Sequence, residues 1–313
     1  MTLTPPSVPT GAKIAVVSPA SSAQPDRITA GIEQLRALGY NPVASQHAYA
    51  KHAPYFSASV EDRLLDLHAA FKDPEVKTII CTRGGYGSNY LLPHIDLDLI
   101  RANPKPFFAY SDHTAIQTWI NDQTGLVSFH GPMAAADFSR ADGVHLESFH
   151  AALTGSPITV TAEQGIRTLR PGHARGTLYG GCLSILTASL GTKYAPQTEG
   201  KLLFLEDVAT KPYQIDRMLR QMILSGKFEG VRGFLFGEML DCASPGADPN
   251  LLEHVILRVL EDFHVPIAIG LRSGHVSHGN VTLPMGIEAE LALNNEQPQL
   301  QILEPAVSPG HAG

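Results

Sequence analysis

Residues 13–39 read KIAVVSPASSAQPDRITAGIEQLRALG, and this stretch decides the fold class. The apolar run at 13–18 contains Ile and Val, which predicts a short strand buried on both faces. From Pro25 onward, apolar side chains recur at helical spacing until Gly39, which stands where a helix is expected to stop. A buried strand followed by an amphipathic helix is the building unit of a parallel sheet covered by helices.

The same unit recurs through the first 150 residues. Ser59 is followed three residues later by Asp62 and then by apolar residues, so we expect it to cap a second helix. A further helix is expected at 112–121. Strands that alternate with helices predict a doubly wound α/β sheet. The remaining short apolar runs predict strands at 41–45, 76–82, 106–110 and 126–129.

The second half of the chain shows a separate alternation of strands and helices. A chain of 313 residues is long enough for two domains of about 150 residues each. We therefore expect an N-terminal α/β domain at 1–150, a linker at 151–175 and a C-terminal domain at 176–313. Within the C-terminal domain the pattern predicts helices at 181–190, 212–224 and 249–261, and strands at 201–206, 231–237, 266–270, 281–283, 288–293 and 299–303.

Composition and charge narrow the classes of function. The net charge is −7 and the basic residues are scattered, which disfavours nucleic acid as a partner. No apolar run approaches the roughly 18 residues of a membrane span, and no secretory signal is visible, so we expect a cytoplasmic protein. Three cysteines are too few and too dispersed for a disulfide framework.

Ser111 is the candidate nucleophile. It lies where an apolar strand stops and a helix begins, which is the position of the serine in a nucleophile elbow, although the flanking glycines of the G-x-S-x-G form are missing. The helix N-terminus would direct unpaired N–H groups at the serine oxygen, so the N–H of Asp112 is a candidate oxyanion donor. The alternative is that Ser111 and Asp112 only cap the helix.

A glycine-rich loop, RGGYG, follows the predicted strand at 76–82. Three glycines in residues 84–87 permit a tight turn with bare backbone N–H groups, at the edge of a parallel sheet where ligands bind. The loop could supply a second oxyanion donor. It could also be a purely structural turn, whereas a phosphate-binding loop would need a different glycine pattern or a lysine.

Two further segments supply an acid and a base. Glu206 and Asp207 close an apolar strand, where an acid can orient a histidine or simply cap the next turn. His275 and His278 lie beside glycines and are three residues apart, a spacing that invites a metal site. No carboxylate or cysteine nearby completes a ligand set, so we expect neither a metal nor a cofactor.

Taken in order, the motifs of this chain resemble those of the LD-carboxypeptidases, a family of serine peptidases that includes muramoyl-tetrapeptide carboxypeptidases and microcin-immunity peptidases. The resemblance runs from about residue 11 to 304 and implies a flavodoxin-like, amidotransferase-like N-terminal domain, a smaller, mainly β C-terminal domain and a homodimer. The shared motifs are VVSPAS at 16–21, RGGYG at 83–87, YSD at 110–112, HGP at 130–132, GGCLS at 180–184, LFLEDV at 203–208, YQIDRML at 213–219, GH at 274–275 and LPMG at 283–286.

The resemblance implies a triad of Ser111, Glu206 and His275, with the N–H groups of Gly85 and Asp112 as oxyanion donors. Arg83 is a candidate to bind the terminal carboxylate of a substrate, because a guanidinium binds carboxylates bidentately; it could equally brace its loop. Two positions depart from the family pattern. Ala109 replaces a glycine two residues before the nucleophile, and Cys182 replaces the asparagine of a GGN motif.

The implied function is removal of D-alanine from cytoplasmic murein tetrapeptides during wall recycling. A microcin-immunity peptidase, which cleaves a peptidyl-nucleotide amide, is a second possibility. Such enzymes favour aromatic stacking on the nucleobase, but the chain's one tryptophan, Trp119, lies on the helix after Ser111. A noncatalytic protein that binds wall peptides is a third possibility, although all three triad residue types are present.

Overall fold

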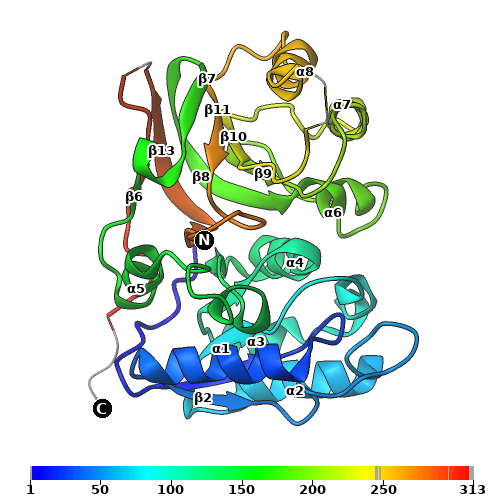
Figure 1. Cartoon of the computed structure of the whole chain (residues 1–313), viewed down its shortest axis with the longest axis vertical. Coiled ribbons are helices and arrows are strands. Elements are labelled where there is room, and N and C mark those ends of the chain that lie inside the picture. The colour runs from blue at the N-terminus through cyan, green and yellow to red at the C-terminus, as the bar shows by residue number, and fades with distance from the viewer. Residues whose placement is uncertain (1, 244–245, 247, 295, 310–313) are drawn as a thin grey trace. The chain divides into compact units, whose positions relative to one another are not determined.

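The computed structural model describes residues 2–243, 246, 248–294 and 296–309. The chain divides into two compact units (Figure 1). Unit 1 comprises residues 1–157, 278–286 and 305–313, and unit 2 comprises residues 158–277 and 287–304. Within the described part of the chain, no helix combines the length and the apolar character needed to cross a membrane.

Unit 1 is built on a six-stranded sheet with the strand order β12-β5-β4-β3-β1-β2. The first five strands of the chain are parallel, and β12 is antiparallel to β5. The predicted doubly wound sheet is thereby confirmed. The strands are β1 (Lys13–Val17), β2 (Asn41–Ala44), β3 (Val76–Cys81), β4 (Phe107–Ala109), β5 (Ser128–His130) and β12 (Leu283–Met285).

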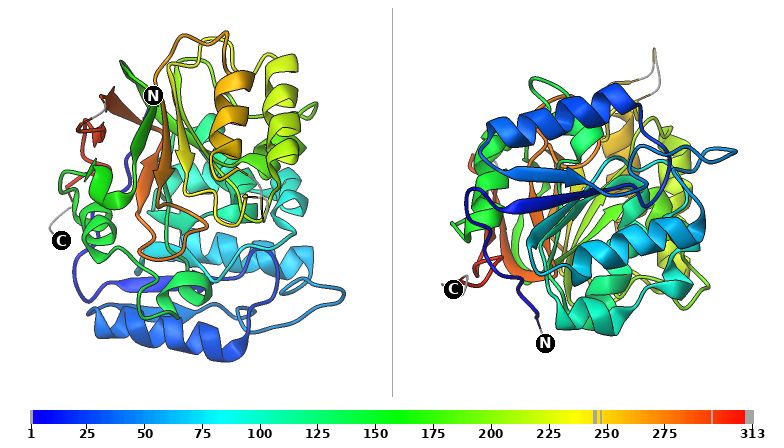
Figure 2. Two further views of the ribbon diagram at one scale, coloured as in Figure 1. Left: turned by 45° about the horizontal axis from the view of Figure 1, so that its top comes forward. Right: turned by 90° about the horizontal axis from the view of Figure 1, so that it is seen from below.

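Helices cover both faces of this sheet, and Figure 2 shows α1 on one face and α2 on the other. Ser59 caps α2 as predicted, because its side chain accepts a hydrogen bond from the N–H of Asp62. The helices are α1 (Pro25–Ala37), α2 (Val60–Lys72), α3 (Leu97–Ala102), α4 (Thr114–Thr124) and α5 (Leu146–Thr154). Short helical turns are η1 (Ser88–Tyr90), η2 (Leu92–His94), η3 (Ser111–His113) and η4 (Ala134–Phe138).

Unit 2 contains an eight-stranded sheet with the order β6-β14-β13-β8-β9-β10-β11-β7. Its four central strands, β8 to β11, are parallel, and the outer strands are antiparallel, so the expected mainly β domain is confirmed. The strands are β6 (Thr159–Val160), β7 (Arg167–Arg170), β8 (Gly172–Cys182), β9 (Lys201–Glu206), β10 (Gly233–Gly237), β11 (Ile267–Leu271), β13 (Ile287–Leu293) and β14 (Gln299–Ile302). One short turn, η5 (Ala162–Gln164), precedes β7.

Three helices pack against this sheet: α6 (Leu183–Ala188), α7 (Pro212–Leu224) and α8 (Leu251–Val259). Alternate residues of β9 and β10, such as Leu205 and Phe234, contact the apolar faces of these helices, for example Leu219. Each such buried side chain contributes about 1.5–3 kcal/mol relative to an exposed one. The core of unit 2 therefore fixes the carboxyl end of β9, where Glu206 lies.

The division into units differs from the expected boundaries at 150 and 175. Residues 158–175 are not a linker, because they supply β6, β7 and the start of β8 to unit 2. The predicted helix at 181–190 starts later, since β8 continues to Cys182. Residues 278–286 belong to unit 1 because β12 pairs with β5. Strand pairing is non-local, so an apolar run alone does not show which sheet it joins.

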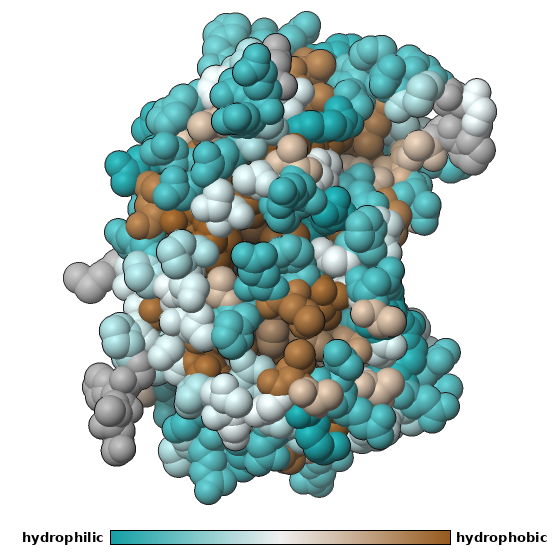
Figure 3. Space-filling view, turned by 60° about the vertical axis from the view of Figure 1, so that its left-hand side comes forward, coloured by the Kyte–Doolittle hydropathy of each residue, from teal (hydrophilic) through white to brown (hydrophobic). Residues whose placement is uncertain are grey.

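Polar residues dominate the surface of the molecule. On the face drawn in Figure 3, they surround smaller apolar patches. Three large aliphatic side chains that are exposed lie on different elements: Val43 on β2, Leu65 on α2 and Leu224 on α7. Isolated exposed apolar residues of this kind are ordinary in folded proteins.

Candidate active site

Ser111 has an unusual backbone conformation, with a φ angle of 63°. It follows β4 and opens the turn η3, which leads directly into α4. A positive φ is uncommon for a residue other than glycine and costs of order 1–3 kcal/mol. The helical turns here do not use Ser111 or Asp112 as caps: the cap residues are Tyr110 and His113, and neither makes a side-chain cap bond. A strained serine between strand and helix has the geometry of a nucleophile elbow.

The glycine-rich loop packs directly against this serine. A Cβ atom added at Gly84 would lie 2.8 Å from the Cβ of Ser111 and 3.0 Å from its Oγ. The same added atom would lie 3.2 Å from the backbone nitrogen of Asp112. Only glycine permits so close an approach, so the glycine at position 84 serves the contact between the loop and the serine.

Two buried side chains fasten the loop to the helix that follows Ser111. The carboxylate of Asp112 accepts a hydrogen bond from the N–H of Ser88 at 2.8 Å. His113 bonds the Ser88 hydroxyl through Nδ1 at 2.8 Å and the Arg83 carbonyl through Nε2 at 2.9 Å. Because a carbonyl oxygen only accepts, Nε2 carries the proton and Nδ1 accepts from the hydroxyl. Burial lowers the pKa of His113, which favours this neutral form.

These hydrogen bonds give His113, Ser88 and Arg83 structural roles in the loop beside Ser111. His113 and Ser88 went unnoticed in the sequence, although a histidine two residues after Ser111 was a visible signal. The Arg83 residue does brace the loop, but through its carbonyl; its side chain is exposed. Arg83 lines a pocket of about 240 Å³ together with Arg27, Gln24 and three alanines.

Asp137 is another buried carboxylate of unit 1, and it contacts the residue that precedes Ser111. It accepts hydrogen bonds from the N–H of Met133 at 2.9 Å, the Asn280 amide at 3.2 Å and the Tyr110 hydroxyl at 3.3 Å. Burial is the main cause that raises the pKa of Asp137 to about 6, and these hydrogen bonds oppose the shift.

The raised pKa makes a prediction about stability. Between pH 4 and pH 6 the folded protein holds a proton on Asp137 that the unfolded chain releases, so this group's contribution to the free energy of unfolding falls as the pH rises. The slope attributable to one group is at most about 1.4 kcal/mol per pH unit. Urea unfolding of the unmodified protein and of Asp137→Asn across this range measures it. Identical pH dependence in the two proteins would contradict the prediction.

In unit 2, Glu206 and His275 form a hydrogen-bonded pair. The Nδ1 atom of His275 lies 2.8 Å from Oε2 of Glu206, which also accepts a bond from the His275 backbone N–H at 3.1 Å. Glu206 is fully buried, whereas the imidazole is 20% exposed. A carboxylate on Nδ1 holds the proton there, so Nε2 of the neutral ring is the basic nitrogen. A carboxylate in this position can orient an imidazole as a base.

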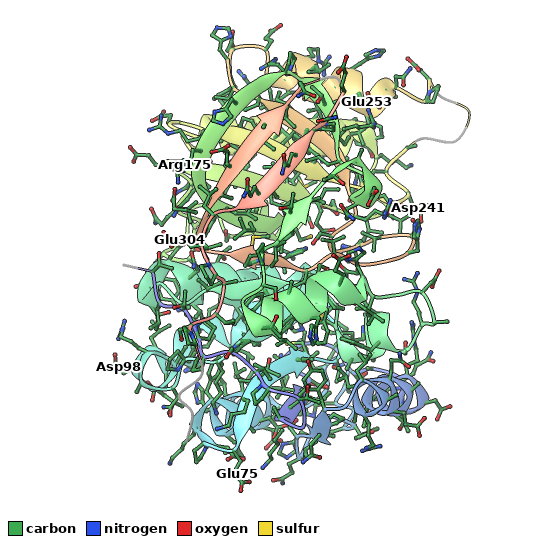
Figure 4. The ribbon with its side chains drawn as sticks, turned by 90° about the vertical axis from the view of Figure 1, so that its left-hand side faces the viewer. Glu75, Asp98, Arg175, Asp241, Glu253 and Glu304 are labelled. Atoms are coloured by element: carbon green, nitrogen blue, oxygen red, sulfur yellow. The ribbon has the colours of Figure 1, made fainter. Side chains whose placement is uncertain are left out.

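The neighbouring acid, Asp207, has a different task. It accepts hydrogen bonds from the N–H groups of Ser184 and Val208, both at 2.9 Å, and from the Thr210 hydroxyl at 2.8 Å. Capping of the next turn, the alternative that the sequence left open for both acids, therefore applies to Asp207. Other acids, such as Glu75, Asp98 and Asp241, are exposed at the surface (Figure 4).

The two departures from the family pattern are both buried. Ala109 lies in β4, paired with His130 in β5. Cys182 pairs in register with Glu206 across β8 and β9. Burial raises the pKa of the Cys182 thiol well above its usual value, and the nearby Glu206 and Asp207 charges add to the shift, so the sulfur stays protonated.

The structure thus groups the predicted residues in two sets. Ser111, Asp112 and the loop that carries Arg83 and Gly85 lie together in unit 1. Glu206 and His275 are bonded in unit 2. Among the described residues, no group of three or more His, Cys, Asp and Glu side chains could hold a metal ion.

Comparison with known proteins assigns the family. Residues 14–131 match the LD-carboxypeptidase N-terminal domain, and residues 175–291 match the LD-carboxypeptidase C-terminal domain. A probable murein peptide carboxypeptidase of Bacillus subtilis is 36% identical over 308 residues, which cover 96% of this chain and 94% of that protein. A murein tetrapeptide carboxypeptidase of Pseudomonas aeruginosa is 30% identical over 91% of this chain and 95% of its own length.

A solved structure extends the likeness to the whole fold. The structure of MccF in complex with glutamyl sulfamoyl guanosine superimposes with a TM-score of 0.89 at 26% sequence identity, covering 98% of this chain and all of the other (100%). Family matches in both halves, relatives of 30% and 36% identity over nearly the full length and the shared architecture agree. The chain belongs to the LD-carboxypeptidase family.

Proposed function

We propose that this protein is a serine LD-carboxypeptidase that removes the C-terminal D-alanine from murein tetrapeptides during wall recycling in the cytoplasm. The observation that carries the proposal is the strained backbone of Ser111, held against Gly84 at the start of a helix. The buried Glu206–His275 pair supplies the base that such a serine needs. Relatives named for murein peptides support the substrate class.

The chemistry follows the Ser-His-acid pattern. His275 takes the proton of the Ser111 hydroxyl through Nε2 while the serine oxygen attacks the peptide carbonyl carbon, and Glu206 stabilises the imidazolium that forms. The N–H groups of Gly85 and Asp112 bind the oxyanion, and losing one such donor typically costs about 10²–10³-fold in rate. The C–N bond then breaks as the imidazolium gives its proton to the leaving amine of D-alanine.

The second half of the reaction releases the enzyme. Water, activated by the same imidazole, attacks the acyl-serine ester and restores the Ser111 hydroxyl. This mechanism requires Ser111 and His275 to meet in the reacting protein. It needs no redox step, because only bonds to one carbonyl carbon are exchanged.

An exopeptidase also recognises the carboxylate at the end of its substrate, and we assign this role to Arg83. This residue lines the same pocket as Arg27, which donates hydrogen bonds to Ser139 at 3.2 Å and to the Ala136 carbonyl at 3.4 Å. Two arginines at one pocket favour an anionic group, and the planar guanidinium matches a carboxylate.

Replacing Arg83 with alanine is expected to raise the KM for a tetrapeptide about 10- to 100-fold, the effect of losing a hydrogen bond to a charged group. Steady-state kinetics on the tetrapeptide acid and on the matching C-terminal amide tests this, because the amide has no carboxylate to lose. An equal rise in KM for both compounds would assign Arg83 to the loop rather than to the substrate.

The decisive experiment follows D-alanine release from a murein tetrapeptide by mass spectrometry. Release by the unmodified protein, with and without EDTA, is expected. Abolition by EDTA would reject the serine mechanism in favour of a metal-dependent one. Sedimentation analysis of the same sample tests the homodimer that we propose as its assembly.

The second candidate function is cleavage of an aminoacyl or peptidyl nucleotide analogue. The likeness to MccF in complex with glutamyl sulfamoyl guanosine favours it. Incubating the protein with aspartyl sulfamoyl adenosine and with the murein tetrapeptide, under identical conditions, compares the two. A higher kcat/KM for aspartyl sulfamoyl adenosine than for the tetrapeptide would favour this second function over the first. Binding without turnover of either compound would indicate a noncatalytic wall-peptide receptor.

A further inference from the structure

Four aromatic side chains form one cluster beside the glycine-rich loop, and we call Tyr55, Phe56, Tyr86 and Tyr90 the tyrosine platform. The ring centroid of Phe56 lies 4.7 Å from Tyr55, 5.5 Å from Tyr90 and 6.0 Å from Tyr86. Tyr86 also lies 5.6 Å from Tyr55 and 5.9 Å from Tyr90. Phe56 and Tyr86 therefore each contact the other three rings at the distances of favourable aromatic pairs.

The platform presents its tyrosines to solvent. Tyr55, Tyr86 and Tyr90 are 48%, 40% and 47% exposed, although a packed aromatic cluster normally lies inside a protein. An exposed group of large rings on one site is characteristic of a binding surface.

The chain beneath the platform is held in place from several sides. Arg63, which is only 2% exposed, stacks its guanidinium 4.8 Å from the Phe56 ring centroid and donates to the carbonyls of Pro19 and Gly87 at 2.8 and 3.0 Å. The N–H of Tyr86 donates to the Ser21 hydroxyl at 3.0 Å. Rings fixed in this way lose little conformational entropy when a ligand covers them.

The same loop connects the platform to the nucleophile. Gly84 contacts Ser111. Tyr86 follows Gly84 by two residues, so the Cα atoms of Gly84 and Tyr86 are at most about 7 Å apart. In a tetrapeptide whose last bond is attacked, three residues precede the scissile bond, and they span at most about 11 Å. A group joined to the amino end of that peptide therefore reaches the region of the platform.

The chemistry of the platform selects the group that it would bind. It offers neutral aromatic faces and phenol hydroxyls, and the buried Arg63 beside Phe56 is committed to backbone carbonyls. Stem peptides of murein are joined at their amino end to a sugar, whose pyranose ring has apolar C–H faces and a rim of hydroxyls. Resting on the proposed function, we propose that the tyrosine platform binds the pyranose ring at the amino end of the murein peptide.

The test compares two substrates, the free tetrapeptide and the N-acetylmuramoyl tetrapeptide, through D-alanine release. The unmodified protein is expected to show a kcat/KM about 3- to 10-fold higher for the sugar-bearing substrate, the range of one aromatic contact. Tyr55→Ala and Tyr90→Ala are each expected to abolish this preference. Tyr90→Phe retains the ring and is expected to keep most of it.

Tyr49 provides a matched control, because it is 42% exposed in the same unit but lies outside the cluster. Tyr49→Ala is expected to leave the ratio of the two kcat/KM values unchanged. Equal use of both substrates by the unmodified protein, or loss of the preference in Tyr49→Ala as well, would overturn the inference. Failure to release D-alanine from either substrate would instead reject the proposed function, and this inference with it.

Discussion

Replacing Ser111 with alanine is expected to lower kcat for tetrapeptide hydrolysis about a million-fold, the loss seen when a serine nucleophile of this type is removed. The variant retains the oxyanion donors and the pocket beside Arg83, so its affinity for the substrate is expected to stay within about threefold of the original, a difference below about 0.7 kcal/mol. Quantitative mass spectrometry of D-alanine and isothermal calorimetry with the tetrapeptide measure the two properties. Turnover that survives the substitution would remove Ser111 from the mechanism.

A second substitution of Ser111 separates the effect of its backbone strain on stability from the effect of its hydroxyl on catalysis. Ser111→Gly also removes the hydroxyl, but glycine accepts a φ of 63° without the steric cost that a Cβ atom imposes. The glycine variant is therefore expected to be inactive and more stable than the alanine variant by up to about 1 kcal/mol. Thermal unfolding of the two variants checks this, and a less stable glycine variant would argue against a strained elbow.

Glu206→Gln is expected to reduce kcat about 10⁴-fold, the penalty observed when the acid of a triad becomes an amide. The amide has nearly the same shape, but it no longer carries the negative charge that stabilises the imidazolium of His275. Both hydrogen bonds from His275 end on the same carboxylate oxygen, so an amide oxygen at that position can accept them although the charge is lost. Steady-state kinetics with the tetrapeptide across pH 5–9 measures the loss.

Asp207→Asn is the matched control for this experiment, because Asp207 is the next residue and is also buried. Its bonds to Ser184, Val208 and Thr210 hold the turn rather than the base. The control is expected to lower the melting temperature while keeping kcat within about tenfold. A larger loss of kcat in Asp207→Asn than in Glu206→Gln would indicate that Asp207, and not Glu206, supports the catalytic base.

Much of the fold could be predicted from local pattern alone. The strand at 201–206 and the helix at 212–224 have the predicted bounds, because their apolar residues recur at the strand or helical period and the flanking Pro212 marks the helix start. The long strand β8 was not predicted, because its first half, residues 172–177, is largely exposed and carries little apolar signal.

The candidate site was predicted to a similar degree. The family resemblance indicated Ser111, Glu206 and His275, whereas the residue pattern without it treated Glu206 and Asp207 alike. Only the folded chain separates them, since one carboxylate contacts His275 and the other contacts the turn at 208–210. The platform of Tyr55 and Tyr86 was also invisible, because its rings come from two loops that are 31 residues apart.

The sequence by itself determined much of the alternation of strands and helices, the family, and the residues that we propose for acyl transfer. These properties depend on local periodicity and on short motifs, which neighbouring residues specify. Tertiary structure alone decided that residues 278–286 return to the first unit, that Ser111 has a strained φ beside Gly84, and that Glu206 rather than Asp207 holds the histidine. Each of these depends on contacts between distant segments, whose partners are chosen by packing and hydrogen bonding in the folded protein.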